Sequence, residues 1–426
     1  NFGKFPRRAR RERDCSSFAH LSLQHRTSES LCTAMSVDQK YIVGGAAVVI
    51  SLGVVRWLAS RGKKKTPPPA YAEAGEEAQG SSRVVVIGGN GFIGKLVVAA
   101  LVEDAFNERR RVVSFDMRLP PKDKRLAGVR YIQGSILEPE HLLKAMQGAT
   151  SVIHLASLKK FLGVDDNAIR NVNVQGTKNV VAACLERNVK NLVYTSSIVV
   201  ALKANNLSHN MNLPHNAPRS GSYVDIYAET KAAAEEVVME AGKGGKLRTC
   251  SLRPTAVFGV GDGVLADKLL VGENNNDHVG SGLAEFDWID GASVARCHAL
   301  ALRSLESRTC TAAGQIYNCG SGEVIQYRKF NGFGTGWWGH GQPKEINFGF
   351  AQFLATINET VCSWTGLVLL PASLMHTSLV MTQVSWSVDI ETTKRDLGFT
   401  TVHPTIGKSI AALVSQHQAA KGVKQA

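Results

Sequence analysis

The sequence predicts an α/β protein: a Rossmann-type, doubly wound parallel sheet, followed by a smaller C-terminal region and preceded by a single membrane-anchor helix. Three observations predict it. Short apolar runs alternate with longer helical patterns from residue 83 onward, a glycine-rich turn follows the first run, and an apolar stretch precedes them all. The expected strands are Val84–Ile87, Arg111–Phe115, Val129–Ile132, Ser151–Leu155, Asn191–Tyr194 and Leu247–Leu252, and the helices between them include Ile93–Val102, Glu138–Met146, Asn171–Glu186 and Tyr227–Glu240.

The N-terminal residues predict a leader and then an anchor. Residues 1–34 precede the first methionine and are rich in arginine and serine, so upstream read-through, a fragment of a longer product and a transit peptide are all open for them. Residues 41–59 form a largely apolar segment about 28 Å long as a helix, close to the about 30 Å of a bilayer core. Basic residues follow directly, which predicts an anchor within residues 35–65 and a catalytic domain facing the cytosol, with the endoplasmic reticulum as the expected membrane. A cleaved signal peptide and a hydrophobic surface segment are the alternatives.

The rest of the chain divides into three parts. Residues 66–82 contain three consecutive prolines without apolar periodicity and predict a linker. Residues 83–260 predict the Rossmann core, and residues 261–426 predict a substrate-binding region that returns elements to the core at about 286–320. The apolar stretch Thr365–Met381 is too polar and too interrupted to span a membrane. A pocket wall, a shallow membrane contact and an ordinary core helix pair all remain open for it.

Charge and cysteine usage exclude two classes of function. The net charge is +13, of which residues 1–34 carry +4 and residues 35–65 carry +5, so the remaining 361 residues carry only +4. No basic stripe marks the folded part, and nucleic-acid binding is not expected. The eight cysteines show no C-x-x-C pair. Reduced thiols therefore fit better than a disulfide framework or a zinc site, and no metal is predicted.

The turn after the first strand has the composition of a dinucleotide site. Gly88, Gly91 and Gly94 let the backbone turn tightly and approach a pyrophosphate, while Phe92 and Ile93 open a helix whose N-terminus favours anions.

An acidic residue at the end of the next strand predicts which cofactor binds there. Asp116 can accept hydrogen bonds from the adenosine ribose and would repel a 2′-phosphate, so NAD is expected rather than NADP. Arg118 argues the other way, because a guanidinium can pair with that phosphate.

Tyr227 and Lys231 form a Y-x-x-x-K pair on a predicted helix, where a spacing of four places both side chains on one face. A phenol is a poor base at neutral pH, but a nearby ammonium and a positive nicotinamide ring stabilise the phenolate. Ser197 ends an apolar strand and can hydrogen-bond a substrate oxygen, with Ser196 as the second choice. Together with the glycine turn, these residues predict hydride-transfer chemistry.

From Val84 to Val414 these features resemble the extended short-chain dehydrogenase/reductase superfamily, and within it the 3β-hydroxysteroid dehydrogenase/isomerase family. The motifs match in order and spacing. The matching segments include the glycine turn, Ile153-His154-Leu155-Ala156-Ser157, Asn173-Val174-Gln175-Gly176-Thr177, Ser197, Tyr227 with Lys231, and Leu247-Arg248-Thr249-Cys250-Ser251-Leu252-Arg253-Pro254.

The resemblance implies oxidation of a sterol C3 alcohol. Tyr227 would take the hydroxyl proton, Ser197 would orient the oxygen, and Lys231 would lower the tyrosine pKa and bind the nicotinamide ribose. His154, Ala156 and Pro254 would lie beside the cofactor.

Some segments depart from the family pattern. Ser135 and Ile136 replace an acid–aliphatic pair expected near the adenine, and Asp290-Gly291 replaces an Asp-Asn pair. Residues 205–222 and 328–341, which would border the substrate, match poorly.

The leading prediction is a membrane-anchored 3β-hydroxysterol dehydrogenase using NAD, with either Δ5–Δ4 isomerisation or loss of a 4-carboxylate following oxidation. An extended reductase or epimerase acting on a flavonoid or nucleotide-sugar is the second enzyme hypothesis. A catalytically dead NAD-binding scaffold is the hypothesis of another class. A homodimer is left open.

Overall fold

The computed structural model describes residues 72–75, 82–103, 110–202, 210–262, 277–338, 343–371 and 374–420 of the chain. The predicted leader at 1–34 and the predicted anchor segment at 41–59 lie outside these residues. In the part that is described, no helix is both long and apolar enough to cross a bilayer. The same part of the chain brings no group of histidine, cysteine and acidic side chains together as a metal site.

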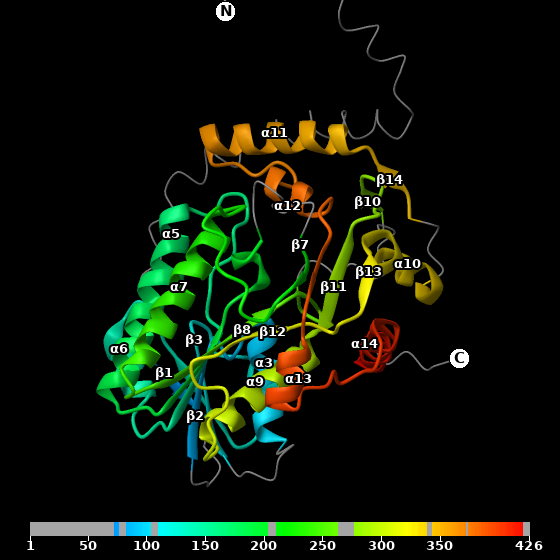
Figure 1. Ribbon diagram of the computed structural model, residues 1–426. Helices are drawn as coiled ribbons and strands as arrows, with labels where there is room; N and C mark the ends of the chain where they lie inside the picture. The colour runs from blue at the N-terminus through cyan, green and yellow to red at the C-terminus, as the bar shows by residue number, and fades with distance from the viewer. Residues whose placement is uncertain are drawn as a thin grey trace, which may run out of the picture. The chain divides into compact units, whose positions relative to one another are not determined.

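The predicted parallel sheet is present, and within the described residues it has eight strands in the order β1-β4-β3-β2-β5-β6-β8-β12 (Figure 1). All neighbouring pairs are parallel except β1 with β4. The order reverses between β2 and β5, which is where Rossmann-type sheets bind their ligands. The strands are β1 (Ala72–Ala74), β2 (Ser82–Ile87), β3 (Arg110–Asp116), β4 (Val129–Gln133), β5 (Ser151–His154), β6 (Asn191–Thr195), β8 (Arg248–Pro254) and β12 (Ile316–Cys319).

Helices cover both faces of this sheet, as the continuous apolar strands predict. Alternate residues of β2 enter two separate cores: Val84 and Val86 pack with one set of helices, whereas Val85 and Ile87 pack with the other. The helices on the first face are α3 (Phe92–Val102) and α9 (Gly291–Glu306), and those on the second are α4 (Pro139–Ala145), α6 (Gly176–Glu186) and α7 (Ile226–Lys243). Shorter helical turns lie at η1 (Lys122–Lys124), α5 (Asp166–Arg170), η2 (Asn171–Gln175), η3 (Ile198–Val200) and α13 (Glu391–Leu397).

The expected linker differs from the structure in one respect, because Ala72–Ala74 forms the edge strand β1. Its pairing with β4 satisfies backbone groups that an edge would leave open, and Glu73 forms an ion pair with Arg130 of β4. Alternating small and acidic residues gave no periodicity from which this strand could be predicted.

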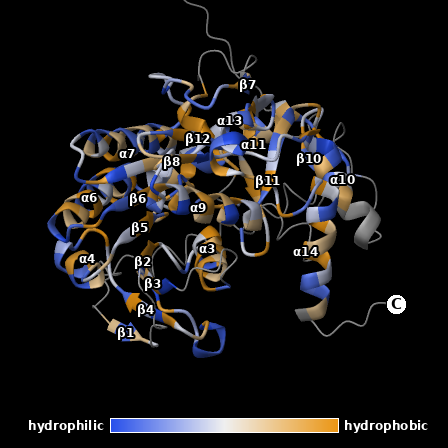
Figure 2. Cartoon of the chain, turned by 60° about the horizontal axis from the view of Figure 1, so that its bottom comes forward, coloured by the Kyte–Doolittle hydropathy of each residue, from blue (hydrophilic) through white to orange (hydrophobic). Residues whose placement is uncertain are grey.

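A second sheet joins strands of the C-terminal half to β7, which comes from the middle of the chain. Its described strands run in the order β13-β11-β15-β7, with β9 also paired to β11. Helix α14 closes its core with Ile406, Ile410 and Val414, spaced four residues apart. Figure 2 shows the resulting alternation of hydrophobic and hydrophilic residues along α14. The elements are β7 (Asn210–Leu213), β9 (Ala256–Phe258), β11 (Glu285–Asp290), β13 (Val324–Gln326), β15 (Trp386–Val388), α10 (Tyr327–Trp338) and α14 (Ile406–Ala420). The short strands β10 (His278–Val279) and β14 (Glu345–Ile346) pair with each other in a separate two-stranded sheet.

The stretch Thr365–Met381 runs from the end of one helix through the next, and these two helices pack on each other. α11 (Phe348–Thr365) ends at Gly366, which adopts a left-handed conformation with φ +72°, and α12 (His376–Met381) follows. Ala351, Ala355 and Leu379 form a small core between them. Of the three alternatives for this stretch, the core helix pair therefore describes the part that belongs to α11 and α12.

Candidate active site

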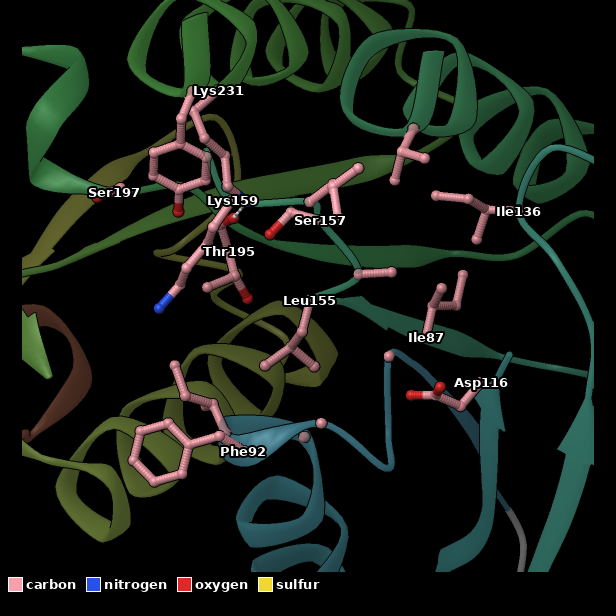
Figure 3. A pocket seen from close by; sticks show the side chains of 18 of the residues that line it. Ile87, Phe92, Asp116, Ile136, Leu155, Ser157, Lys159, Thr195, Ser197 and Lys231 are labelled. Carbon is pink, nitrogen blue, oxygen red and sulfur yellow. Dashed lines mark hydrogen bonds between the residues drawn. The ribbon is translucent and has the colours of Figure 1, made fainter. Parts of the chain in front are cut away.

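A cavity of about 860 Å³ opens at the carboxyl ends of β2, β3, β6 and β8, beside the point where the strand order reverses (Figure 3). Parallel strands bring their carboxyl ends to one edge of the sheet, so residues far apart in sequence meet there. The predicted site residues that line it are Gly88, Gly91, Phe92, Ile93, Gly94, Asp116, Ser135, Ile136, Ala156, Ser197, Tyr227, Lys231 and Pro254.

Two predicted cofactor residues do not line the cavity. The His154 ring is fully buried behind it and bonds to Thr177 Oγ1 of α6 at 3.0 Å. Burial, and then the charge of Lys231, lower the pKa of His154 to about 3, so the ring is neutral. The Arg118 side chain is exposed to solvent, and only its backbone N–H contacts Asp116, at 3.3 Å from Oδ1. Strand alternation turns His154 toward the helices, while Arg118 lies past the end of β3.

The glycine turn forms a cradle that side chains would fill. Gly88 has φ +82°, and a Cβ there would lie 2.7 Å from the backbone nitrogen of Ala156. A Cβ on Gly94 would lie 2.0 Å from the Gly88 carbonyl oxygen. Gly91 caps α3 without a side-chain hydrogen bond, which leaves the N–H groups of the first turn available to an anion. The turn therefore fits a dinucleotide pyrophosphate.

Asp116 is held at the end of β3 by the backbone of the glycine turn. Its Oδ2 accepts a hydrogen bond from Asn90 N at 3.1 Å. The Asn90 side chain is fixed in turn, because its Oδ1 accepts from Ser114 Oγ at 2.8 Å and its Nδ2 donates to Arg118 O at 2.5 Å. Burial raises the pKa of Asp116, while these backbone hydrogen bonds oppose the rise. The carboxylate is thus held in the cavity wall beside the glycine turn, and its contact with an adenosine ribose stays a prediction.

Tyr227 and Ser197 meet at the far end of the cavity from Asp116. Asp225 caps α7 by accepting from Ala228 N at 2.8 Å, which places Tyr227 in the first turn of the helix. Burial raises the pKa of Tyr227 and the charge of Asp225 adds to the rise, whereas hydrogen bonds with Ser197 and Ser157 lower it. The predicted decrease of the tyrosine pKa does not occur in the chain alone, because burial raises this pKa more than Ser197 and Ser157 lower it.

Lys231 lies one turn further along α7 and is almost fully buried. Its Nζ donates to the Thr195 carbonyl oxygen at 2.6 Å and lies 5.0 Å from the centre of the Tyr194 ring. Burial, and then the positive charge of Lys159, lower the pKa of Lys231 to about 7, with Glu235 opposing them. An ammonium has three donors, so two remain for ribose hydroxyls.

The lowered pKa of Lys231 predicts a pH-dependent stability. Between pH 7 and its ordinary pKa of 10.5, the unfolded chain binds a proton that the folded chain has lost. Stability therefore rises with pH in this window, by at most about 1.4 kcal/mol per pH unit. We expect the free energy of unfolding of the wild type, relative to that of Lys231→Met, to increase on going from about pH 7 to about two units higher. Urea unfolding measures it, and parallel pH profiles for the two proteins would contradict it.

Two cavity residues and one buried residue behind them were not among the predicted site residues. Ser157 contributes a hydroxyl beside Tyr227, and Lys159 contributes an amine. Asn173 lies in the π-helical turn η2, and its side chain clamps Leu158 by accepting from Leu158 N at 2.7 Å and donating to Leu158 O at 3.0 Å. Such turns often mark functional sites. The Asn-x-x-Gly-Thr motif located this helix, although it did not identify the clamp.

A buried ion pair fixes the catalytic helix to the sheet. Glu235 of α7 accepts from Arg253 of β8 at 2.6 and 3.0 Å and from Ser251 Oγ at 2.9 Å. Arg253 Nη1 also donates to the Ala217 carbonyl oxygen at 2.6 Å. Burial alone would raise the pKa of Glu235, but Arg253 and the serine hydroxyls hold it below its usual value. Glu235 lies one turn after Lys231, so the pair positions the helix that carries the catalytic residues.

The fold and the site define a dinucleotide-dependent oxidoreductase of the Rossmann type. Residues 85–350 match the model of the 3-beta hydroxysteroid dehydrogenase/isomerase family. The human 3 beta-hydroxysteroid dehydrogenase type 7 is 31% identical over 339 residues, which cover 74% of this chain and 90% of that protein. The chain belongs to this family, and the predicted enzyme class is confirmed.

Other relatives differ in the reaction that their names state. The sterol-4-alpha-carboxylate 3-dehydrogenase ERG26, decarboxylating, of Candida albicans is 31% identical over 52% of this chain and 65% of its own length. Among solved structures, MoeE5 in complex with UDP-glucuronic acid and NAD has a TM-score of 0.61 at 20% identity, covering 80% of this chain and all of that one. That likeness confirms the fold. The family membership favours the steroid hypothesis over the nucleotide-sugar alternative.

Proposed function

We propose that this protein oxidises the 3β-hydroxyl of a sterol or steroid with NAD as its cofactor. The observation that carries the proposal is the meeting of Ser197, Tyr227 and Lys231 at one end of a cavity whose other end holds the glycine turn and Asp116. The cofactor, when bound, supplies the hydride acceptor.

The chain's own groups would position the alcohol and move its proton. Ser197 and Tyr227 line the same end of the cavity, where a substrate hydroxyl can hydrogen-bond both side chains. Tyr227 accepts the proton of the alcohol as the C3 hydrogen leaves as hydride. Because burial raises the pKa of the phenol, proton transfer needs positive charge nearby. The nicotinamide ring of NAD+ supplies it when bound, and Lys231 and Lys159, which line the same cavity, add to it in their protonated forms.

A substrate panel with the full chain tests the function. A 3β-hydroxysteroid, a 4-carboxysterol, a flavonoid and a nucleotide-sugar are each offered with NAD and with NADP. We expect dinucleotide reduction with the sterols, and NAD to be preferred because Asp116 repels a 2′-phosphate. Failure to oxidise any sterol would refute the function, and a strong preference for NADP would refute the role of Asp116.

We also propose that the protein is attached to a membrane. Residues 41–59 suit an anchor in the endoplasmic reticulum membrane, and the basic residues after them suit a cytosolic catalytic domain. Further support comes from α11, where Phe353, Ile357 and Trp364 are exposed on one face, Trp364 to 84%. A sterol dissolved in a bilayer would reach such a surface directly. Protease added to intact microsomes should digest the catalytic domain, and protection would contradict this orientation.

A further inference from the structure

Lys159 places a positive charge inside the cavity. Lys159 follows Leu158, whose backbone N–H and C=O are both hydrogen-bonded by the Asn173 side chain. These bonds hold the backbone directly before Lys159 in place. The Lys159 side chain is exposed to solvent, and it lines the cavity. Figure 3 shows the Lys159 side chain passing in front of Thr195, with its nitrogen in the open space between Ser197 and Phe92.

The amine of Lys159 has no bonded partner among the described residues. Its neighbour Lys160 differs, because Lys160 Nζ donates to Val164 O at 3.0 Å and forms an ion pair with Asp166 at 2.6 Å. Burial lowers the pKa of Lys159, and the charge of Asp262 raises it without a direct contact. Lys159 in turn lowers the pKa of Lys231. The catalytic end of the cavity therefore holds two lysines, of which Lys231 is bound to protein and Lys159 is not.

A cation in this position favours an anionic ligand. Charge-assisted hydrogen bonds are about twice as strong as neutral ones, and they strengthen where surrounding protein excludes water. The glycine turn and the first turn of α3 already offer N–H groups to the cofactor phosphates. Lys159 lies near the residues that hold the reacting alcohol, so an anion on the substrate suits it.

We propose that Lys159 binds a carboxylate that the substrate carries on the carbon next to its reacting alcohol, and thereby selects carboxylated sterols over neutral ones. This specificity role rests on the proposed sterol dehydrogenase function. Lys159 acts electrostatically on Lys231, and both line the cavity together with Tyr227 and Ser197. A substrate carboxylate can therefore bind the Lys159 ammonium while the neighbouring alcohol stays within reach of the phenol. The anion could alternatively come from the cofactor, as its pyrophosphate, and the experiment distinguishes the two sources.

The test compares one sterol with and without a 4-carboxyl group, using the full-length wild type, Lys159→Met and the matched control Lys160→Met. NAD reduction gives kcat/KM for each substrate, and titration gives the KM for NAD. We expect Lys159→Met to lower kcat/KM for the carboxylated sterol by about 10- to 100-fold. The neutral sterol should be affected less than about twofold, and Lys160→Met should keep the wild-type ratio between the two substrates.

Each other outcome overturns the assignment. An equal loss on both sterols together with a raised KM for NAD would assign Lys159 to the cofactor pyrophosphate. No loss on either sterol would mean that the amine binds no anion during turnover. In both cases the wild type still oxidises sterols, so the proposed function stands. If the wild type oxidises neither sterol, that function fails and the carboxylate subsite fails with it.

Discussion

Tyr227→Phe is expected to lower kcat by about 100- to 10,000-fold, the contribution that a positioned proton-transfer group typically makes. The substitution removes only the hydroxyl that Ser197 and Ser157 contact, so the ring still packs on the first turn of α7. Steady-state oxidation of a sterol with saturating NAD measures the loss.

The control for this prediction is Tyr223→Phe, which removes a phenol four residues earlier, outside the cavity lining. It should retain wild-type turnover. NAD binding, measured by isothermal titration, should be unchanged in Tyr227→Phe because the glycine turn and Asp116 lie at the other end of the cavity. Turnover that survives Tyr227→Phe would show that another group moves the proton.

The site could be predicted where its chemistry depends on local spacing. The glycine turn, Asp116 at the end of β3, and the Tyr227–Lys231 pair each need one element or one junction, and the sequence specifies those directly. All of them line the cavity. Their meeting follows from the parallel sheet, because each lies after a strand or on the helix that follows one.

Features that depend on contacts between distant segments could not be predicted. Whether His154 faces the cavity or a helix depends on the register of β5. His154 pairs with Ile87 of β2, and Ile87 belongs to the core that also contains residues of α6 and α7. The clamp of Asn173 on Leu158 joins residues 15 positions apart through a π-turn that no composition rule indicates. From the sequence alone, Lys159 cannot be distinguished from other surface lysines. The structure shows that it lines the cavity, directly after the residue that Asn173 holds.

The pKa shifts of the site residues could not be predicted from the sequence either. A spacing of four correctly placed Tyr227 and Lys231 on one helix, but the direction of their pKa shifts depends on burial. Both groups are surrounded by protein, which raises the pKa of the tyrosine and lowers that of the lysine. Burial therefore disfavours the charged form of each group, and binding of a positive nicotinamide ring is expected to favour the phenolate.

The buried pair of Glu235 and Arg253 gives the prediction with the largest effect on stability. Both side chains are at most 1% exposed. Glu235→Leu leaves the guanidinium of Arg253 buried without its carboxylate, and such a loss costs about 3–5 kcal/mol. Urea unfolding of the full chain should show this decrease in the free energy of unfolding.

The double variant Glu235→Leu/Arg253→Met separates a buried uncompensated charge from a loss of packing. Replacing both partners of a buried ion pair by apolar residues of similar volume is often neutral, so the double variant should recover most of the stability that Glu235→Leu loses. A double variant as unstable as the single one would mean that the hydrogen bonds to Ser251 and Ala217 carry the stability instead. Since Glu235 and Lys231 lie on successive turns of α7, recovery of stability without recovery of turnover would show that the ion pair also sets the position of the catalytic lysine.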